Sequence, residues 1–205
     1  MSDLQIFDCE QGSEAWFACR LGIPTASRFK DVLAKGQGLT RRKYLYTLAG
    51  ERLTGEQAES YTNEAMQRGH AMEAEARERY AFQMDAEPQL VGFMRRKVGE
   101  HWIGASPDAL LGEDGLLEIK TKLPHLHLEA LESNRLPPEH VAQVQGQLWI
   151  SGRQWCDFVS YWPRLPLFCI RVPRDDAYID TLTVEVEAFN AELSAIVRKY
   201  QREAA

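Results

Sequence analysis

Two carboxylates and a lysine stand at a spacing typical of metal-assisted hydrolysis. Ser106-Pro107-Asp108 is followed, after nine residues, by Glu118-Ile119-Lys120. Alternate side chains of a β-strand share a face, so Glu118 and Lys120 are expected to project together. Gly112 and Gly115 predict a turn between two paired strands, which would bring Asp108 beside Glu118.

Such a pair of carboxylates favours a divalent cation. Neighbouring carboxylates repel and raise each other's pKa, and a hard cation relieves that repulsion. All-oxygen ligation by Asp108, Glu118 and the carbonyl of Ile119 favours Mg²⁺, with Mn²⁺ as a substitute, over zinc. Lys120 would orient or help to deprotonate a water, or offset charge on a phosphate, which suits phosphodiester hydrolysis. Taken alone, the same spacing also fits an ordinary hairpin with an exposed acid and an exposed ion pair.

The elements that must position these residues are helices followed by strands. Helices are expected where Ser13 and Thr25 provide N-caps, over about 40–53 and 63–85, from Pro137-Pro138 to Gly152, and over 175–200. Strands are expected over 90–98, 102–105, 116–120, 155–162 and 167–172. The order predicts an α/β (α+β) fold with a central mixed β-sheet flanked by helices.

No internal repeat or long linker divides the chain. We expect a single domain over residues 1–205, with a helical N-terminal part (1–87), a sheet-bearing catalytic core (88–172) and a C-terminal helix (175–200). The net charge of −6 argues against a protein that holds nucleic acid by bulk charge. The four cysteines form no C-x-x-C pair, and no apolar run approaches the ~20 residues that span a bilayer. We therefore expect free thiols, no membrane association and a cytoplasmic location.

The S-P-D and E-I-K segments resemble the PD-(D/E)xK nuclease core. More narrowly, the chain is similar to the lambda exonuclease family, the YqaJ-like phage recombination nucleases. Ala109 and His140 stand where that family usually has a glycine and an aromatic residue. The resemblance covers roughly residues 10–162 and includes matching motifs, in the family's order, at residues 10–16, 20–22, 25–27, 68–73 and 142–149.

The resemblance implies a restriction-endonuclease-like core and a Mg²⁺-dependent 5′→3′ exonuclease. Such an enzyme hydrolyses the 5′-ended strand of linear double-stranded DNA to mononucleotides and leaves a 3′ overhang for single-strand annealing. Its implied partners are DNA ends, a single-strand annealing protein and two further copies of the chain in a homotrimeric ring. Two other interpretations stay open: another PD-(D/E)xK endonuclease or repair nuclease, and a catalytically inactive DNA-binding module.

Two flanking residues are candidates for supporting the chemistry. Glu73, on the helix that matches the family's R-G-x-x-x-E motif, would supply a carboxylate to a second metal or its water; the alternative is a solvated helical glutamate. Gln143 would hydrogen-bond the metal-bound water or a phosphate oxygen; the alternative is a residue that caps the helix or lies at its surface.

Arg20, Ser27 and Ser106 match the positions at which the family binds a terminal 5′-phosphate. A guanidinium fork and two hydroxyls suit an anion, whereas without the resemblance they are a surface arginine and two turn or cap residues. Trp16 would stack on a terminal base or pack in the core. His125 and His127 are expected to be surface histidines rather than a metal pair.

Overall fold

The described residues form two β-sheets. The computed structural model describes residues 3–34, 39–58 and 64–203. An antiparallel sheet has the order β1-β2-β3, and a mixed sheet has the order β4-β5-β6-β7, with β5 and β6 parallel. The strands are β1 Leu4–Phe7, β2 Phe93–Val98, β3 His101–Ala105, β4 Ala109–Leu111, β5 Gly115–Lys120, β6 Trp155–Ser160 and β7 Phe168–Pro173.

The predicted mixed sheet is therefore confirmed as the four-stranded one, while β2 and β3 belong to a separate sheet. Pro107 lies between β3 and β4 and has no N–H to continue a ladder. An isolated bridge between Gln89 and Leu110 joins the segment before β2 to β4. The first 87 residues, expected to be helical, also contain the short strand β1.

Helices form over the expected segments, with residue 63 of the predicted 63–85 helix outside the described part of the chain. Thr25 stands at the start of η1 but makes no side-chain capping hydrogen bond. The Oγ of Ser13 accepts the N–H of Trp16 at the start of α1, and α6 opens on Pro138 and ends at Gly152 with φ +79°. One helix, α5, has no counterpart in the sequence prediction. The helices are α1 Glu14–Arg20, the 3₁₀ turn η1 Ala26–Arg28, α2 Phe29–Val32, α3 Leu39–Thr54, α4 Glu64–Met84, α5 Pro124–Ser133, α6 Pro138–Ser151 and α7 Asp176–Glu203.

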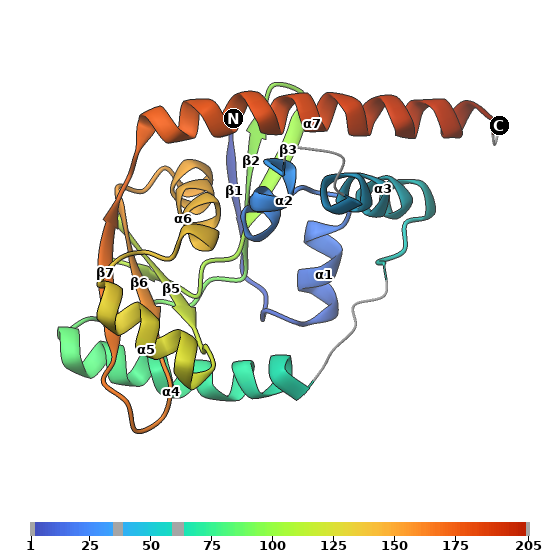
Figure 1. The fold of residues 1–205 in the computed structure, drawn as a ribbon. Helices are drawn as coiled ribbons and strands as arrows, with labels where there is room; N and C mark the ends of the chain where they lie inside the picture. The colour runs from blue at the N-terminus through green and yellow to red at the C-terminus, as the bar shows by residue number, and fades with distance from the viewer. Residues whose placement is uncertain (1–2, 35–38, 59–63, 204–205) are drawn as a thin grey trace.

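Helices cover both faces of the mixed sheet. The long helix α7 runs along one side of the molecule over α2, α3 and α6, while α4 and α5 lie on the opposite side near β5–β7 (Figure 1). Leu116 on β5 packs in a cluster with α5 and α6, whereas Leu117 and Ile119 pack in a cluster with α4. Side chains on both faces of strand β5 are therefore buried.

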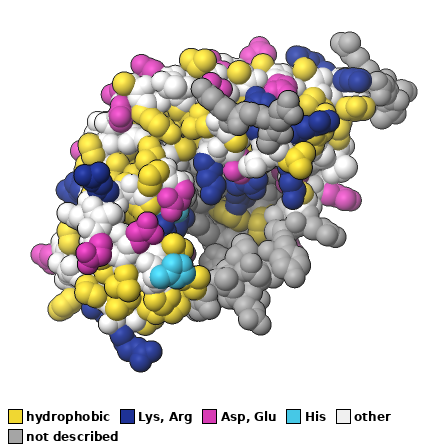
Figure 2. Space-filling model, viewed as in Figure 1, with side chains coloured by type: hydrophobic (Ala, Val, Ile, Leu, Met, Phe, Trp, Pro, Cys, Tyr) yellow, Lys and Arg dark blue, Asp and Glu magenta, His cyan; other side chains and the backbone are white. Residues whose placement is uncertain are grey.

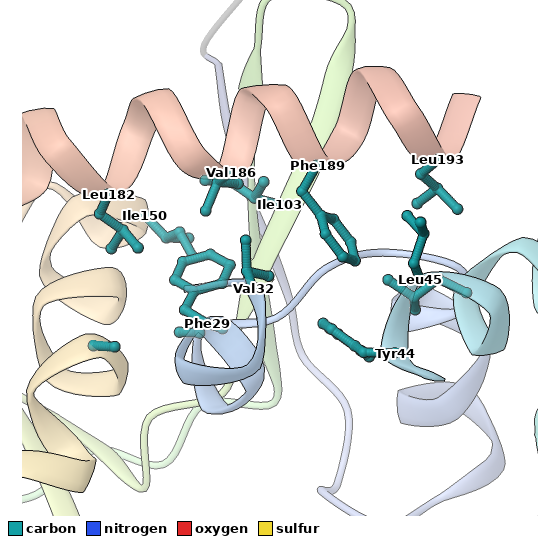
Figure 3. Close-up of a cluster of buried hydrophobic side chains, with 14 of the residues drawn as sticks. Phe29, Val32, Tyr44, Leu45, Ile103, Ile150, Leu182, Val186, Phe189 and Leu193 are labelled. Atoms are coloured by element: carbon teal, nitrogen blue, oxygen red, sulfur yellow. The ribbon is translucent and has the colours of Figure 1, made fainter. Parts of the chain in front are cut away.

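The apolar side of α7 closes the largest core cluster. Val186, Phe189 and Leu193 point from α7 toward residues of α2 and α3, including Phe29 and Tyr44 (Figure 3). Burial of these side chains stabilises the fold by roughly 1.5–3 kcal/mol for each. The described helices include none with both the length and the apolar character required to cross a bilayer.

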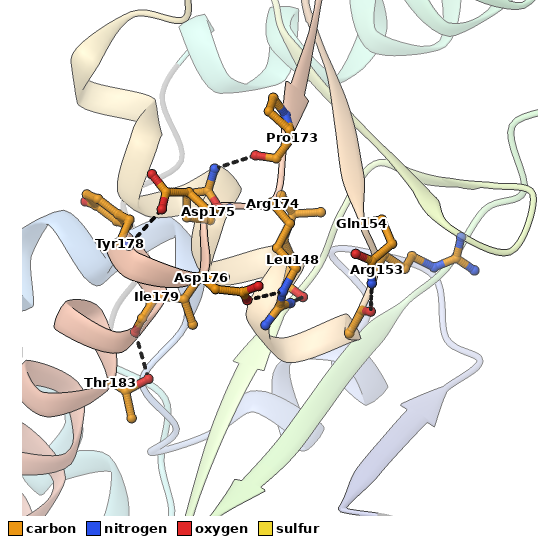
Figure 4. Close-up of polar contacts among 12 residues, drawn as sticks. Leu148, Arg153, Gln154, Pro173, Arg174, Asp175, Asp176, Tyr178, Ile179 and Thr183 are labelled. Carbon is orange, nitrogen blue, oxygen red and sulfur yellow. Dashed lines mark hydrogen bonds and ion pairs between the residues drawn. The ribbon is translucent and has the colours of Figure 1, made fainter.

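Helix α6 is the structural centre of the molecule, because it contacts α2, α7 and strands of both sheets. A Cβ at Gly146 would lie 2.5 Å from the ring of Phe29, so only glycine allows this close approach to α2. At its other side, Arg174 donates to the carbonyl of Leu148 at 2.7 Å (Figure 4). Gln145 donates to the carbonyl of Pro173 and accepts the N–H of Asp175, both at 2.9 Å.

Candidate active site

The hairpin formed by β4 and β5 places Asp108 beside Glu118, as the two glycines predict. The N–H of Asp108 donates to the carbonyl of Leu117 at 3.0 Å. The N–H of Ile119 in turn donates to Oδ2 of Asp108 at 2.5 Å. Asp108 is thus fixed against the main chain of the strand that carries Glu118.

Glu118 is buried, with 1% of its surface exposed, and both of its oxygens are hydrogen-bonded. Its Oε1 accepts from Nζ of Lys120 and from Nε2 of Gln143, each at 2.5 Å. Its Oε2 accepts from Nε2 of Gln147 at 2.6 Å. The structure therefore brings Asp108, Glu118, Lys120 and Gln143 together, and adds Gln147.

The charges of this cluster are not balanced. Burial, together with the negative charges of Glu118 and Glu73, raises the pKa of Asp108 well above its usual range. Burial alone would lower the pKa of Lys120, but the adjacent carboxylates outweigh it, and the pKa of Lys120 is raised. Lys120 balances one of the two carboxylates of the cluster, so that with Asp108 and Glu118 both ionised one negative charge is left for a cation to neutralise.

The donor set fits a hard divalent cation held by two carboxylates and main-chain oxygen. Within the described part of the chain, no three histidine, cysteine or acidic side chains gather into a metal-binding group. Glu73 is near enough to raise the pKa of Asp108, but it pairs with Arg77 at 3.3 Å. The contact of Ile119 with Asp108 is made by the N–H of Ile119. The use of the Ile119 carbonyl as a metal ligand stays a prediction. In the motif at 68–73, the side chains of residues 68–71 lie outside the described part of the chain.

A second cluster surrounds Trp16 on α1. The indole Nε1 of Trp16 donates to Oγ of Ser106 at 2.8 Å, and the guanidinium carbon of Arg20 lies 3.9 Å from the centre of the Trp16 ring. Trp16 is half-buried in this stack rather than packed in the core. The tryptophan therefore joins Arg20 to Ser106, two residues before Asp108.

Ser27 is linked to this cluster indirectly. Its exposed side chain lies on η1 with Oγ 3.2 Å from Oγ1 of Thr25, and Thr25 forms a bridge with Gly104, two residues before Ser106. The structure shows no direct contact among the three polar side chains of the predicted phosphate site, but it places all three around the end of β3.

Positive charge is concentrated near this second cluster. Figure 2 shows Lys and Arg side chains beside a hollow in the middle of one face, close to α1 and α2. Burial lowers the pKa of Arg20, and the charge of Arg28 lowers it further, while Tyr44 and Glu51 oppose the shift. Arg28 stacks on Tyr44 at 4.5 Å and pairs with Asp31.

One histidine was predicted wrongly. His125 is exposed as expected, but His127 is fully buried and bridges Oγ of Ser160 at 2.8 Å and the carbonyl of Pro166 at 2.9 Å. Its position on the unpredicted helix α5 turns it toward β6, so both ring nitrogens find partners. The four cysteines are free, as expected.

Comparisons with known proteins identify a family and several solved structures that are similar to this chain. Residues 15–154 match the family model described as the YqaJ-like viral recombinase domain. An alkaline exonuclease, LHK-Exo, from Laribacter hongkongensis is 42% identical, with a TM-score of 0.85, over 94% of this chain and 98% of that chain. The structure of LHK-Exo in complex with dAMP matches over the same shares at 43% identity and TM-score 0.85.

A phage-related exonuclease from Haemophilus somnus 129PT shares the fold at 14% identity. Its TM-score is 0.64, over 87% of this chain and 96% of that chain. No curated protein gives a significant match. The family match and the LHK-Exo similarity each cover most of the chain, and the chain belongs to the YqaJ-like viral recombinase domain family.

Proposed function

We propose that this chain is a phage-type exonuclease that hydrolyses the 5′-ended strand of linear double-stranded DNA in the presence of Mg²⁺. The observation that carries the proposal is the convergence of Asp108, Glu118 and Lys120 on one hairpin. Its support from relatives is the 42% identity to an alkaline exonuclease over nearly the whole chain.

In the proposed reaction Asp108 and Glu118 would hold the cation, with the carbonyl of Ile119 as a further donor. A bound divalent cation supplies Lewis-acid stabilisation of the phosphate and lowers the pKa of a water. Lys120 stays protonated beside the carboxylates and offsets charge that develops on the phosphate. Gln143 donates to Glu118 at the partly exposed side of the cluster and would hydrogen-bond a metal-bound water or a phosphate oxygen there.

Direction would come from the Trp16 cluster rather than from the carboxylates, because phosphodiester hydrolysis has no inherent polarity. A terminal 5′-phosphate carries more charge than an internal phosphodiester. The guanidinium of Arg20, with the hydroxyls of Ser27 and Ser106, would recognise that extra charge. Trp16 positions both Arg20 and Ser106, and this supports a role in holding the terminal nucleotide.

Mononucleotide products, a homotrimeric ring and an annealing-protein partner complete the proposal. The complex of the relative LHK-Exo with dAMP supports mononucleotide release. The ring and the partner rest on the family resemblance. A chain with a net charge of −6 has little bulk attraction for DNA, so enclosure by a ring would explain how it stays on its substrate.

The test compares linear duplex with relaxed closed-circular duplex, both in Mg²⁺, with wild type and Asp108→Asn. We expect wild type to degrade only linear DNA. It should release a label at the 5′ end of a strand as a mononucleotide before it releases a label at the 3′ end. Cleavage of both substrates would instead indicate an endonuclease. Binding without cleavage of either would indicate an inactive module.

A further inference from the structure

The second oxygen of Glu118 is held by a residue that the proposed chemistry does not yet use. Gln147 lies one helical turn after Gln143 on the same face of α6. Its Nε2 donates to Oε2 of Glu118 at 2.6 Å, and only 1% of Gln147 is exposed. The two oxygens of Glu118 therefore meet different surroundings.

Oε1 faces the part of the cluster that is open to ligands, since both of its partners are partly exposed. Lys120 has 30% of its side chain exposed, and Gln143 is half-buried. Oε2 instead faces the interior, where Gln147 covers it. Oε1 accepts from Lys120 and Gln143, which are both partly exposed, whereas Oε2 accepts from the buried Gln147. A cation that approaches from the open side would therefore compete with Lys120 and Gln143 for Oε1, while Gln147 stays on Oε2.

One polar atom of Gln147 is buried without a hydrogen-bond partner in the described part of the chain, which is energetically unfavourable. Its own Oε1 is buried and accepts no hydrogen bond from the described residues. A buried unpaired carbonyl is unfavourable, and an apolar side chain of similar size would avoid that penalty. The favourable polar contact of Gln147 is therefore the hydrogen bond from its Nε2 to Glu118.

From these contacts, and on the basis of the proposed metal site, we infer that Gln147 is a positioning residue that restricts Glu118 to one-oxygen metal ligation and thereby favours Mg²⁺ or Mn²⁺ over Ca²⁺. Mg²⁺ demands octahedral geometry with short bonds, whereas Ca²⁺ readily accepts a carboxylate through both oxygens. A donor fixed on Oε2 opposes two-oxygen ligation. Hydrogen bonds that orient ligating groups typically change metal affinity 10–100-fold.

The experiment measures Mn²⁺ and Ca²⁺ binding by titration calorimetry without DNA. It uses Gln147→Met, which keeps the side-chain length and removes the donor. The matched control is Gln145→Met, because Gln145 is also buried on α6 but bonds Pro173 and Asp175 instead. Thermal unfolding of both variants shows whether their losses of stability are comparable.

We expect Gln147→Met to bind Mn²⁺ about 10–100-fold more weakly. Ca²⁺ binding should weaken less, so the ratio of the Ca²⁺ to the Mn²⁺ Kd falls by at least about fivefold. Gln145→Met should leave this ratio unchanged. An unchanged ratio in Gln147→Met would overturn the inference. Should Gln147→Met not fold, Gln147→Asn shortens the reach of the amide by one methylene and is read in the same way.

Failure of the underlying proposal would look different. If wild type binds neither ion, or Asp108→Asn binds Mn²⁺ as wild type does, the proposed metal site is wrong and the role of Gln147 falls with it. If wild type binds Mn²⁺, Asp108→Asn does not, and Gln147→Met matches wild type for both ions, only the inference about Gln147 is wrong.

Discussion

The indole Nε1 of Trp16 donates a 2.8 Å hydrogen bond to Oγ of Ser106, 90 residues later in the chain. Ser106 lies two residues before Asp108, so this bond connects α1 with the segment that carries a proposed metal ligand. The guanidinium of Arg20 stacks on the Trp16 ring, with its central carbon 3.9 Å from the ring centre. Recognition of a DNA end and hydrolysis would therefore be coupled through Trp16.

Trp16→Phe keeps an aromatic ring for Arg20 but removes the donor to Ser106. A hydrogen bond of this kind contributes about 0.5–1.5 kcal/mol, so kcat/KM on 5′-phosphorylated duplex should fall roughly 2–10-fold. The rate on 5′-hydroxyl duplex should change less. Trp102→Phe is the control, since Trp102 stacks on Arg95 in the three-stranded sheet. Equal losses on the two substrates would show that Trp16 has no part in phosphate recognition.

Arg20→Ala tests the phosphate site itself. A charge-assisted hydrogen bond contributes about 1.5–3 kcal/mol, so its loss should slow digestion of 5′-phosphorylated duplex about 10- to 150-fold. On 5′-hydroxyl duplex the variant should approach wild type. The exposed Arg198 of α7 provides a control arginine. The assignment fails if wild type shows no preference for the phosphate, or if Arg20→Ala lowers both rates by the same factor.

The local elements of the site were predictable because each depends on neighbouring residues. Gly112 and Gly115 indicate the hairpin, Ser13 indicates the start of α1, and the S-P-D…E-I-K spacing indicates the pairing of Asp108 with Glu118. A resemblance covering several motifs in the family's order then indicated the family, which the comparisons confirm.

The missed features depend on contacts between distant segments. His127 is buried only because α5 packs near β6 and β7, and nothing in its neighbours' polarity shows that Pro166 and Ser160 will approach it. Gln147 was overlooked among the glutamines of α6, although its i+4 spacing from Gln143 places both on one face. Separation of β2 and β3 into their own sheet likewise depends on which strands pair, and periodicity alone does not determine pairing.

Helix α4, which carries Glu73, is joined to the sheet by a polar network around the buried carboxylate of Asp157. The hydroxyl of Tyr80 donates to Asp157 at 2.6 Å, and Arg171 pairs with both oxygens of Asp157 at 2.8 and 2.9 Å. Tyr80→Phe should lower the free energy of unfolding by about 1 kcal/mol. Arg171→Ala should cost about 1–3 kcal/mol, because Asp157, only 1% exposed, then lacks a charged hydrogen-bond partner, although the arginine itself is 56% exposed.

Urea denaturation measures both losses. The control is Arg41→Ala, which breaks an exposed pair with Glu192 at 2.8 Å and should cost less than about 1 kcal/mol. A free energy of unfolding for Tyr80→Phe equal to that of wild type would show that the bond from Tyr80 to Asp157 does not anchor α4. Equal small effects of Arg171→Ala and Arg41→Ala would show that Asp157 does not need its cation.

His140 gives the protein a specific pH dependence of stability. Burial and the charges of Lys122 and Lys120 lower the pKa of His140 from 6.5 to about 4. The unfolded chain thus binds a proton first, so the contribution of neutral His140 is fully present above pH 6.5 and is lost as the pH falls toward 4. The loss amounts to at most about 3 kcal/mol.

His140→Phe should therefore flatten the decline of stability between pH 6.5 and 4. Phenylalanine keeps a ring against Phe158, whose centre lies 5.1 Å from that of His140. Denaturant unfolding of both proteins at several pH values makes the comparison. Parallel curves would show that His140 is protonated equally in the folded and unfolded chains.

The most direct test of the central claim is nucleotide release from linear duplex by Asp108→Asn in Mg²⁺. Loss of a proposed metal ligand should slow release by at least on the order of 10²-fold. The melting temperature should stay the same or rise, because the repulsion between Asp108 and Glu118 is relieved. Glu113→Gln, which changes an exposed carboxylate in the turn of the same hairpin, should release nucleotides as wild type does. Release by folded Asp108→Asn at the wild-type rate would contradict the account.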